Sequence, residues 1–164
     1  DNTSGKHYNL YKLHGSINWY IVNDKLHQSE KIEEDPELIF GIQHKMTSVD
    51  PYFYYSSILR IACHDEAKLI VVIGYSYADE YVNIIISQAL NMRSELRVIN
   101  VAPFNISEDA EKKRIAERQH QRLKLKNLEQ LIVVNATAKD FMTKTMNKDF
   151  FVKQIKEPEG SPFD

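Results

Sequence analysis

The sequence predicts an α/β fold, a three-layer sandwich in which helices cover both faces of a mainly parallel sheet. Three apolar runs, 69–73, 96–101 and 131–134, have the length and the β-branched composition of buried strands. Segments with apolar residues at three- and four-residue spacing lie between them, which predicts intervening helices. Because strands that alternate with helices form parallel sheets through right-handed crossovers, we expect these three strands to be parallel.

The segment 68–90 is the centre of this arrangement. Its unbroken apolar run predicts a strand buried on both faces, which ends at Gly74 and continues through a short turn containing Ser76 into a helix from about Asp79. Gly74 lets the backbone approach a ligand closely, and free backbone N–H groups at a helix N-terminus favour phosphates. A single glycine is a weak signal, so a purely structural turn and a ligand-binding turn both remain open on this segment alone.

Further elements are expected on either side of this unit. Residues 107–126 predict a mostly charged helix with a thin apolar stripe, whose basic half, including Arg118 and Arg122, we interpret as a solvated face rather than a nucleic-acid contact. The other expected elements are a strand at 8–13, a hairpin at 18–28 with its turn at 23–24, a short strand at 38–40, and helices at 52–64 and 137–146.

Composition narrows the classes of function. The 164 residues suffice for one domain with a hydrophobic core, which we place at 1–155, followed by a linker or tail at 156–164. A formal net charge of -2 gives no general attraction to nucleic acid or to anionic membranes. The single cysteine, Cys63, excludes a disulfide framework and a cysteine-rich zinc site, and it favours a cytoplasmic protein. No run of about 20 apolar residues is present to span a bilayer.

His14 is the first candidate for chemistry. It lies in the motif KLHGSINW, at the end of a predicted strand and directly before a glycine. An imidazole can accept a proton near neutral pH, although a single histidine is more often a structural hydrogen-bonding residue. The other histidines show no regular spacing with acids or cysteines, so we expect no metal site.

Several motifs occur in a fixed order between residues 8 and 142: YKLHGSINW, IFG, DPYFYYSS, LIVVIGYSYADEYVN and VINVAP. Together they resemble the sirtuin-like (SIR2-like) NAD-consuming domains of bacteria, and more narrowly the later half of the branch found in anti-phage defence proteins. The resemblance implies a Rossmann-like fold whose N-terminal part is missing here, because the family's Gly-Ala-Gly loop and Asn-Asp motif would lie upstream of residue 1. We therefore expect the chain to be a fragment that is inactive alone.

The resemblance also implies roles for four residues. His14 matches the catalytic histidine that acts as a base on the nicotinamide-ribose hydroxyls. Gly74 and Ser76 match the turn that holds the NAD phosphates and the adenosine side, and Asn100 matches an asparagine that hydrogen-bonds the adenosine ribose. The segment 18–28 stands where protein-deacylating sirtuins carry a four-cysteine zinc module, and it contains no cysteine.

These matches imply an NAD+ glycohydrolase that forms nicotinamide and ADP-ribose, needs no metal and acts in bacterial anti-phage defence. The alternatives are a non-catalytic module that binds NAD or ADP-ribose, a purely structural domain, and a protein deacylase, which the missing cysteines disfavour. By analogy with the family, we expect a homo-oligomer and an additional sensor domain in the full-length protein. Neither a membrane nor a nucleic acid is an expected partner.

Overall fold

The computed structural model of the protein describes residues 9–23, 25–36, 38, 52–104 and 108–155. The chain divides into two units, residues 1–58 and residues 59–164, and each is described by itself below. The single domain expected at 1–155 stays a prediction. The expectations for Tyr8, 39–51, Ser107 and 156–164 fall outside the described residues.

A parallel sheet forms the centre of the unit 59–164. Its strands are β3 (Leu69–Ile73), β4 (Arg97–Ala102) and β5 (Leu131–Asn135), in the order β3-β4-β5. Both pairings are parallel and in register, so that Val101 of β4 lies between Ile73 and Val134. The prediction of an α/β fold with a mainly parallel sheet is therefore confirmed.

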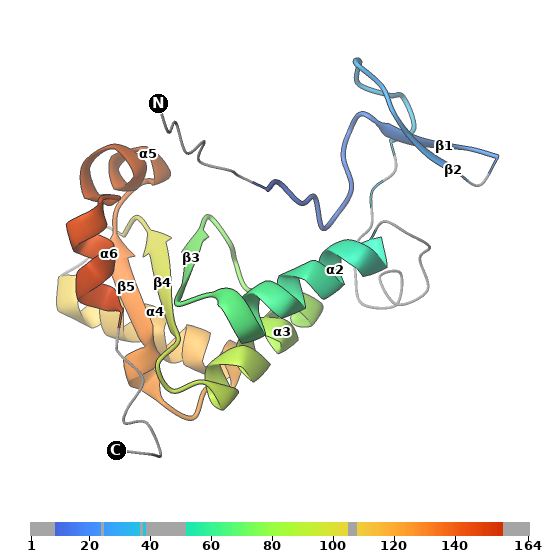
Figure 1. Ribbon diagram of the computed structural model, residues 1–164. Helices are drawn as coiled ribbons and strands as arrows, with labels where there is room; N and C mark the ends of the chain where they lie inside the picture. The colour runs from blue at the N-terminus through green and yellow to red at the C-terminus, as the bar shows by residue number, and fades with distance from the viewer. Residues whose placement is uncertain (1–8, 24, 37, 39–51, 105–107, 156–164) are drawn as a thin grey trace, which may run out of the picture. The chain divides into compact units, whose positions relative to one another are not determined.

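Helices cover both faces of this sheet, as Figure 1 shows, with α3 on one side and α6 on the other. Alternate residues of β4 belong to different hydrophobic clusters, because successive side chains of a strand point to opposite faces. Val98 packs in a cluster with residues of α3 and α4, whereas Ile99 and Val101 pack with Phe141. The described α-helices of this unit are α3 (Glu80–Met92), α4 (Glu108–Leu123), α5 (Ala138–Asp140) and α6 (Lys148–Gln154), and α2 (Tyr52–Ile61) spans residues of both units.

The burial predicted for β3 is wrong. Val72 is buried, but Val71 and Ile73 on the opposite face are 37% and 38% exposed. Among the described residues, β3 pairs with a strand on one edge only, whereas β4 pairs on both edges and its four middle residues are buried. The β-branched composition specifies a strand, while burial depends on which neighbours cover it.

Most helix predictions are confirmed, but the helices expected at 52–64 and 137–146 are α-helical only at Tyr52–Ile61 and Ala138–Asp140, and they continue as π-helical turns at Ala62–Glu66 and Phe141–Thr145. The α3 helix begins at the expected place, and the carboxylate of Asp79 accepts hydrogen bonds from the backbone of Tyr81 and Val82. The α4 helix ends three residues before the expected residue 126, because Lys124 adopts a left-handed backbone with φ 47°. The sequence interpretation missed α6, a short helix capped by the Asn147 side chain, which accepts from the backbone of Phe150.

The unit 1–58 contains a two-stranded antiparallel hairpin of β1 (Trp19–Val22) and β2 (Lys25–Gln28), which confirms the expected hairpin. The strand predicted at 8–13 is wrong for its described residues, since 9–12 have no regular structure and 13–14 form a turn. Alternating residues form a strand only where a partner strand pairs with them. Here Tyr11 packs instead against the ring of Tyr55, with 5.6 Å between ring centroids.

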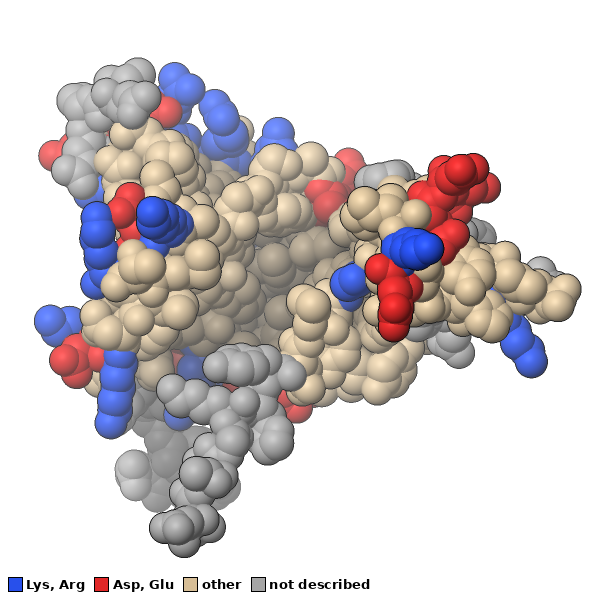
Figure 2. All heavy atoms as spheres, turned by 90° about the horizontal axis from the view of Figure 1, so that it is seen from above, with Lys and Arg blue, Asp and Glu red and all other residues tan. Residues whose placement is uncertain are grey.

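The distribution of Lys and Arg side chains can be followed on one face of the protein. On the face shown in Figure 2, the Lys and Arg side chains of the described residues project as separate groups, with acids between some of them. A continuous basic surface is not visible on this face among the described residues. The expectation that the protein does not bind nucleic acid stays a prediction. None of the described helices is both long enough and apolar enough to cross a membrane.

Candidate functional site

A pocket of about 440 Å³ opens at the carboxyl ends of the strands in the unit 59–164. This is the edge at which open α/β sheets bind ligands, and the volume lies within the range of ligand pockets. Its walls come from the turn after β3, the end of β4, one side of α4 and the start of α5. The lining residues are Ile73, Gly74, Tyr75, Ser76, Tyr77, Asn100, Val101, Ala102, Pro103, Phe104, Glu111, Ile115, Arg118, Gln119, Arg122, Thr137 and Ala138.

The turn between β3 and α3 requires unusual backbone conformations. Gly74 has φ 68°, in the left-handed region where side chains are disfavoured. A Cβ built on Gly74 would meet no atom within 4 Å, so the glycine serves the backbone conformation and not close packing. Tyr77 is left-handed as well, with φ 59°, which is uncommon for a bulky residue and must be held in place by its surroundings.

Side-chain hydrogen bonds hold this turn. The Tyr75 hydroxyl lies 2.9 Å from Oδ1 of Asn83 and 3.0 Å from the carbonyl oxygen of Asp79. The Asn83 amide donates to the carbonyl of Tyr77 at 2.9 Å, and the hydroxyl of Tyr77 donates to Oδ1 of Asn100 at 3.2 Å. The rings of Tyr75 and Tyr77 contact each other, with 4.8 Å between centroids.

Both tyrosines stay neutral in this environment. Burial raises the pKa of Tyr75 to about 12, and the Asp79 carboxylate adds to this effect. Burial also raises the pKa of Tyr77, with a further contribution from Tyr75. The two hydroxyls therefore act as hydrogen-bonding groups at physiological pH and not as bases.

Arg122 connects α4 to the same turn. Its Nη1 atom donates to the carbonyls of Ser76 at 2.9 Å and Tyr77 at 2.7 Å. A guanidinium carries five N–H donors, so these two contacts leave donors for an anionic ligand. Arg118 lies one helical turn earlier and also lines the pocket. Both arginines are solvent-exposed, as the sequence interpretation expected, but their place beside the pocket was missed.

The N-terminus of α3 is less available to a phosphate than the sequence suggested. The Asp79 carboxylate already accepts from the backbone N–H groups of Tyr81 and Val82. A negative side chain at this position also competes electrostatically with an anionic ligand. Phosphate binding in this pocket would therefore depend more on the two arginines of α4 than on the helix N-terminus.

Three of the four residues predicted to have functional roles lie in this pocket. Gly74 and Ser76 are exposed in its wall, and Asn100 is buried with only 3% of its surface exposed. The fourth, His14, belongs to the unit 1–58, where it is half-buried in a turn. The pocket is lined only by described residues of the other unit. The functional roles of all four residues stay predictions.

Gln119 is the lining residue that the sequence interpretation overlooked most completely. It lies on α4 between the two arginines and is only 6% exposed, yet its Oε1 atom has no hydrogen-bond partner among the described residues. A buried acceptor without a partner costs about 1–3 kcal/mol of stability. The signal available in the sequence was the spacing of Gln119, which follows Ile115 by four residues and therefore lies on the same side of α4. This helix has few apolar positions, so a polar residue on that side is notable.

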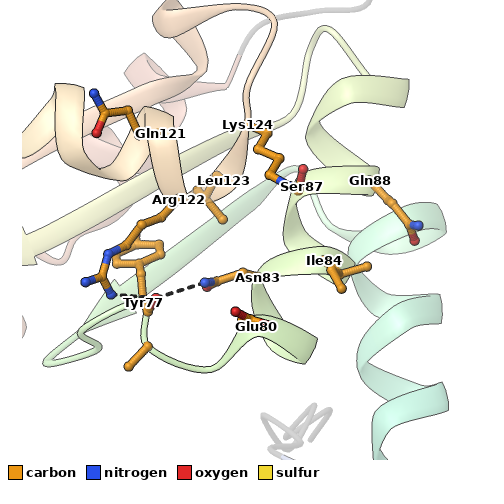
Figure 3. A pocket seen from close by; sticks show the side chains of 11 residues that line it. Tyr77, Glu80, Asn83, Ile84, Ser87, Gln88, Gln121, Arg122, Leu123 and Lys124 are labelled. Atoms are coloured by element: carbon orange, nitrogen blue, oxygen red, sulfur yellow. Dashed lines mark hydrogen bonds between the residues drawn. The ribbon is translucent and has the colours of Figure 1, made fainter. Parts of the chain in front are cut away.

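A second cavity of about 730 Å³ lies between α3 and the end of α4. Figure 3 shows Asn83 and Arg122 both directed at Tyr77, from α3 and α4 respectively. This cavity is larger, but it lies between helices and not at the strand ends. We therefore take the smaller pocket as the candidate ligand site.

Neither a metal site nor an activated thiol is evident in the described part of the chain. It contains no group of three or more His, Cys, Asp or Glu residues that could hold a metal ion. Cys63 is buried as the sequence predicted, and burial raises the pKa of its thiol. A raised thiol pKa disfavours the reactive thiolate.

A protein-family model for the SIR2-like domain matches residues 1–129. The chain belongs to the SIR2-like family. Domains of this family bind NAD, which gives this SIR2-like chain an NAD-related function. The matched region contains the turn at Gly74, Asn100 in the second half of β4, and the α4 wall of the pocket. No curated protein and no solved structure matches the chain.

Proposed function

We propose that this SIR2-like domain is an NAD+ glycohydrolase, which converts NAD+ and water to nicotinamide and ADP-ribose. The observation that supports it best is the pocket at the strand ends, where an exposed glycine turn faces two arginines of α4. Guanidinium groups suit the two phosphates of NAD, and the exposed backbone of Gly74 and Ser76 allows close approach. Asn100 lies in the same wall, where the family resemblance assigns an adenosine-ribose contact.

In the proposed reaction, the bond between nicotinamide nitrogen and ribose C1′ breaks through an oxocarbenium-like state. Nicotinamide leaves with the electron pair of that bond, and the oxygen of water forms the new bond to C1′. His14 would act as the base, by withdrawing a proton from a ribose hydroxyl or from the attacking water, and that proton passes to solvent. The protein otherwise contributes orientation and a shielded site.

The family resemblance of the GYSYADEYVN segment supports a role in bacterial anti-phage defence. The same resemblance supports a homo-oligomer with a sensor domain in the full-length protein. Protein deacylation is less well supported, because the segment 18–28 holds no cysteine for the zinc module of deacylating sirtuins.

A non-catalytic binding module is the second candidate. One observation favours it: every described lining residue of the pocket belongs to the unit 59–164, so the groups proposed to contact a nucleotide there do not include His14. In that case, ADP-ribose would bind and NAD+ would remain intact.

The test measures nicotinamide and ADP-ribose released from NAD+ by the full-length protein. We expect His14→Ala to lower the rate roughly 100-fold or more, since a positioned general base contributes about 10²–10⁴-fold. The matched control is His27→Ala, which removes an exposed histidine of the hairpin in the same unit and should leave the rate unchanged.

Binding of ADP-ribose, measured by calorimetry, separates the two candidates. Turnover in the wild type, lost in His14→Ala with ADP-ribose binding retained, supports the hydrolase. Binding without turnover in any variant supports the binding module. Turnover at the wild-type rate in His14→Ala contradicts the role proposed for this histidine.

A further inference from the structure

We propose that Gln119 recognises the amino-bearing edge of an adenine ring, and that it thereby sets the base specificity of the pocket. This inference rests on the proposed function for the identity of the ligand as an NAD-type nucleotide. It adds a specificity-determining residue on α4, a helix to which the motif-based predictions assigned no ligand contact.

The first argument is the unpaired oxygen. Gln119 is 94% buried, since its exposed fraction is 6%, and it lines the pocket at the strand ends. Its Oε1 atom has no partner among the described residues. Buried polar atoms are nearly always hydrogen-bonded, so an exception in the wall of a pocket indicates a partner that arrives with a ligand.

The second argument is that other acceptors and donors in the pocket wall already bond within the protein. Oδ1 of Asn100 accepts from the Tyr77 hydroxyl, and Nη1 of Arg122 donates to two backbone carbonyls. The carboxylate of Glu111 pairs with Arg114 at 3.6 Å. Among the described residues that line the pocket, Gln119 is thus the buried one whose side-chain acceptor is unpaired.

The third argument is chemical fit. A carboxamide matches adenine in two places, because its oxygen accepts from the exocyclic amine while its NH₂ group donates to a ring nitrogen. The terminal amide torsion of glutamine is soft, so the oxygen can turn toward an incoming donor at little cost. On the edge where adenine presents its amine and N7, hypoxanthine presents two acceptors, O6 and N7, so neither orientation of the carboxamide can pair with both atoms.

Arg118 and Arg122 flank Gln119 in sequence and also line the pocket. Guanidinium groups bind phosphate oxygens, so α4 presents phosphate-binding and base-recognising side chains to one cavity. A nucleoside diphosphate with an adenine base combines both kinds of group.

The experiment compares ADP-ribose with its hypoxanthine analogue, inosine diphosphate ribose, by calorimetry on the full-length protein. We expect the wild type to bind ADP-ribose roughly 10- to 100-fold more tightly, the discrimination typical of a lost bidentate contact. Gln119→Leu, which removes both amide groups at similar volume, should reduce this preference to about twofold or less. Gln121→Leu is the matched control, because Gln121 lies on the same helix and lines the other cavity, and it should keep the full preference.

The outcomes are distinct. Equal binding of both nucleotides by the wild type, or an undiminished preference in Gln119→Leu, overturns the inference and leaves the proposed function standing. Binding of neither nucleotide by the wild type contradicts the proposed function itself. Gln119→Met provides a second variant without the amide, so the comparison does not depend on the folding of one protein.

Discussion

The two walls of the pocket differ in where their polar side chains find partners. In the turn after β3, Tyr75, Tyr77 and Asn83 bond to one another and to the backbone. On α4, Arg118 forms no hydrogen bond or ion pair with another described residue, and the buried oxygen of Gln119 has no partner among them either. The first wall is therefore stabilised by the protein itself, whereas the second offers groups to a ligand. Substitutions in the turn should change stability, and substitutions of Arg118 and Gln119 should change binding.

The largest stability effect is expected at Asn83. This residue is 7% exposed, and its amide links the turn carbonyl of Tyr77 to the hydroxyl of Tyr75. Asn83→Ala removes both contacts and leaves buried groups unpaired, so we expect a loss of about 2–3 kcal/mol in the free energy of unfolding. Urea denaturation measures this loss.

The control for Asn83 is Gln121→Ala, at an exposed position of α4, which should change the free energy of unfolding by less than about 0.5 kcal/mol. A loss at Asn83 no larger than this control would show that the turn is not held by the tyrosine–asparagine network.

A smaller effect is expected at Gly74. Its φ of 68° disfavours alanine by about 1–2 kcal/mol. An added Cβ would meet no other atom within 4 Å, so we expect no further cost from a steric clash. Asparagine tolerates the left-handed region better, so Gly74→Asn should destabilise the protein less than Gly74→Ala. Thermal unfolding of the two variants gives this order. Equal losses would contradict the assignment of this cost to the left-handed backbone.

Tyr75 provides a test of the turn by pH. Its pKa is raised to about 12 in the folded protein from the usual value near 10. The folded state therefore holds this proton more tightly, so its contribution to stability is fully present below about pH 10 and is lost as pH rises toward 12. Tyr75→Phe should flatten the fall in unfolding free energy over this window. An unchanged slope between pH 10 and 12 would contradict the burial-driven shift.

The smallest stability effect is expected at Arg118. Arg118→Ala removes an exposed side chain that has no hydrogen-bond or ion-pair partner among the described residues, so the free energy of unfolding should change by less than about 0.5 kcal/mol. Loss of one charged phosphate contact should weaken ADP-ribose binding roughly tenfold. Calorimetry and urea denaturation on the same preparation measure the two effects. Destabilisation without a change in binding would reverse the comparison between the two walls.

Local patterns predicted much of the fold. The apolar runs specified β3, β4 and β5, and the acid at Asp79 marked the start of α3. The glycine at the end of β3 marked a turn that needs a left-handed residue. These features depend on backbone sterics and on side-chain periodicity, which a short segment already contains.

Other features could not be predicted from local patterns. The exposure of Val71, the absence of a strand at 9–12, and the burial of Gln119 all depend on which segment packs against another. The tertiary structure also placed Arg118 and Arg122 beside the residues that follow β3, although 42 or more positions separate them from Ser76 in the chain.

The sequence by itself determined the α/β order of elements, the glycine turn and the family resemblance, because these are properties of short segments and of their order along the chain. Only the tertiary structure decided that the turn is closed by its own tyrosines and Asn83, and that α4 completes the pocket with two arginines and an unpaired amide oxygen. The physical reason is that hydrogen-bond satisfaction depends on distances between segments, and these distances are fixed only when the helices pack on the sheet.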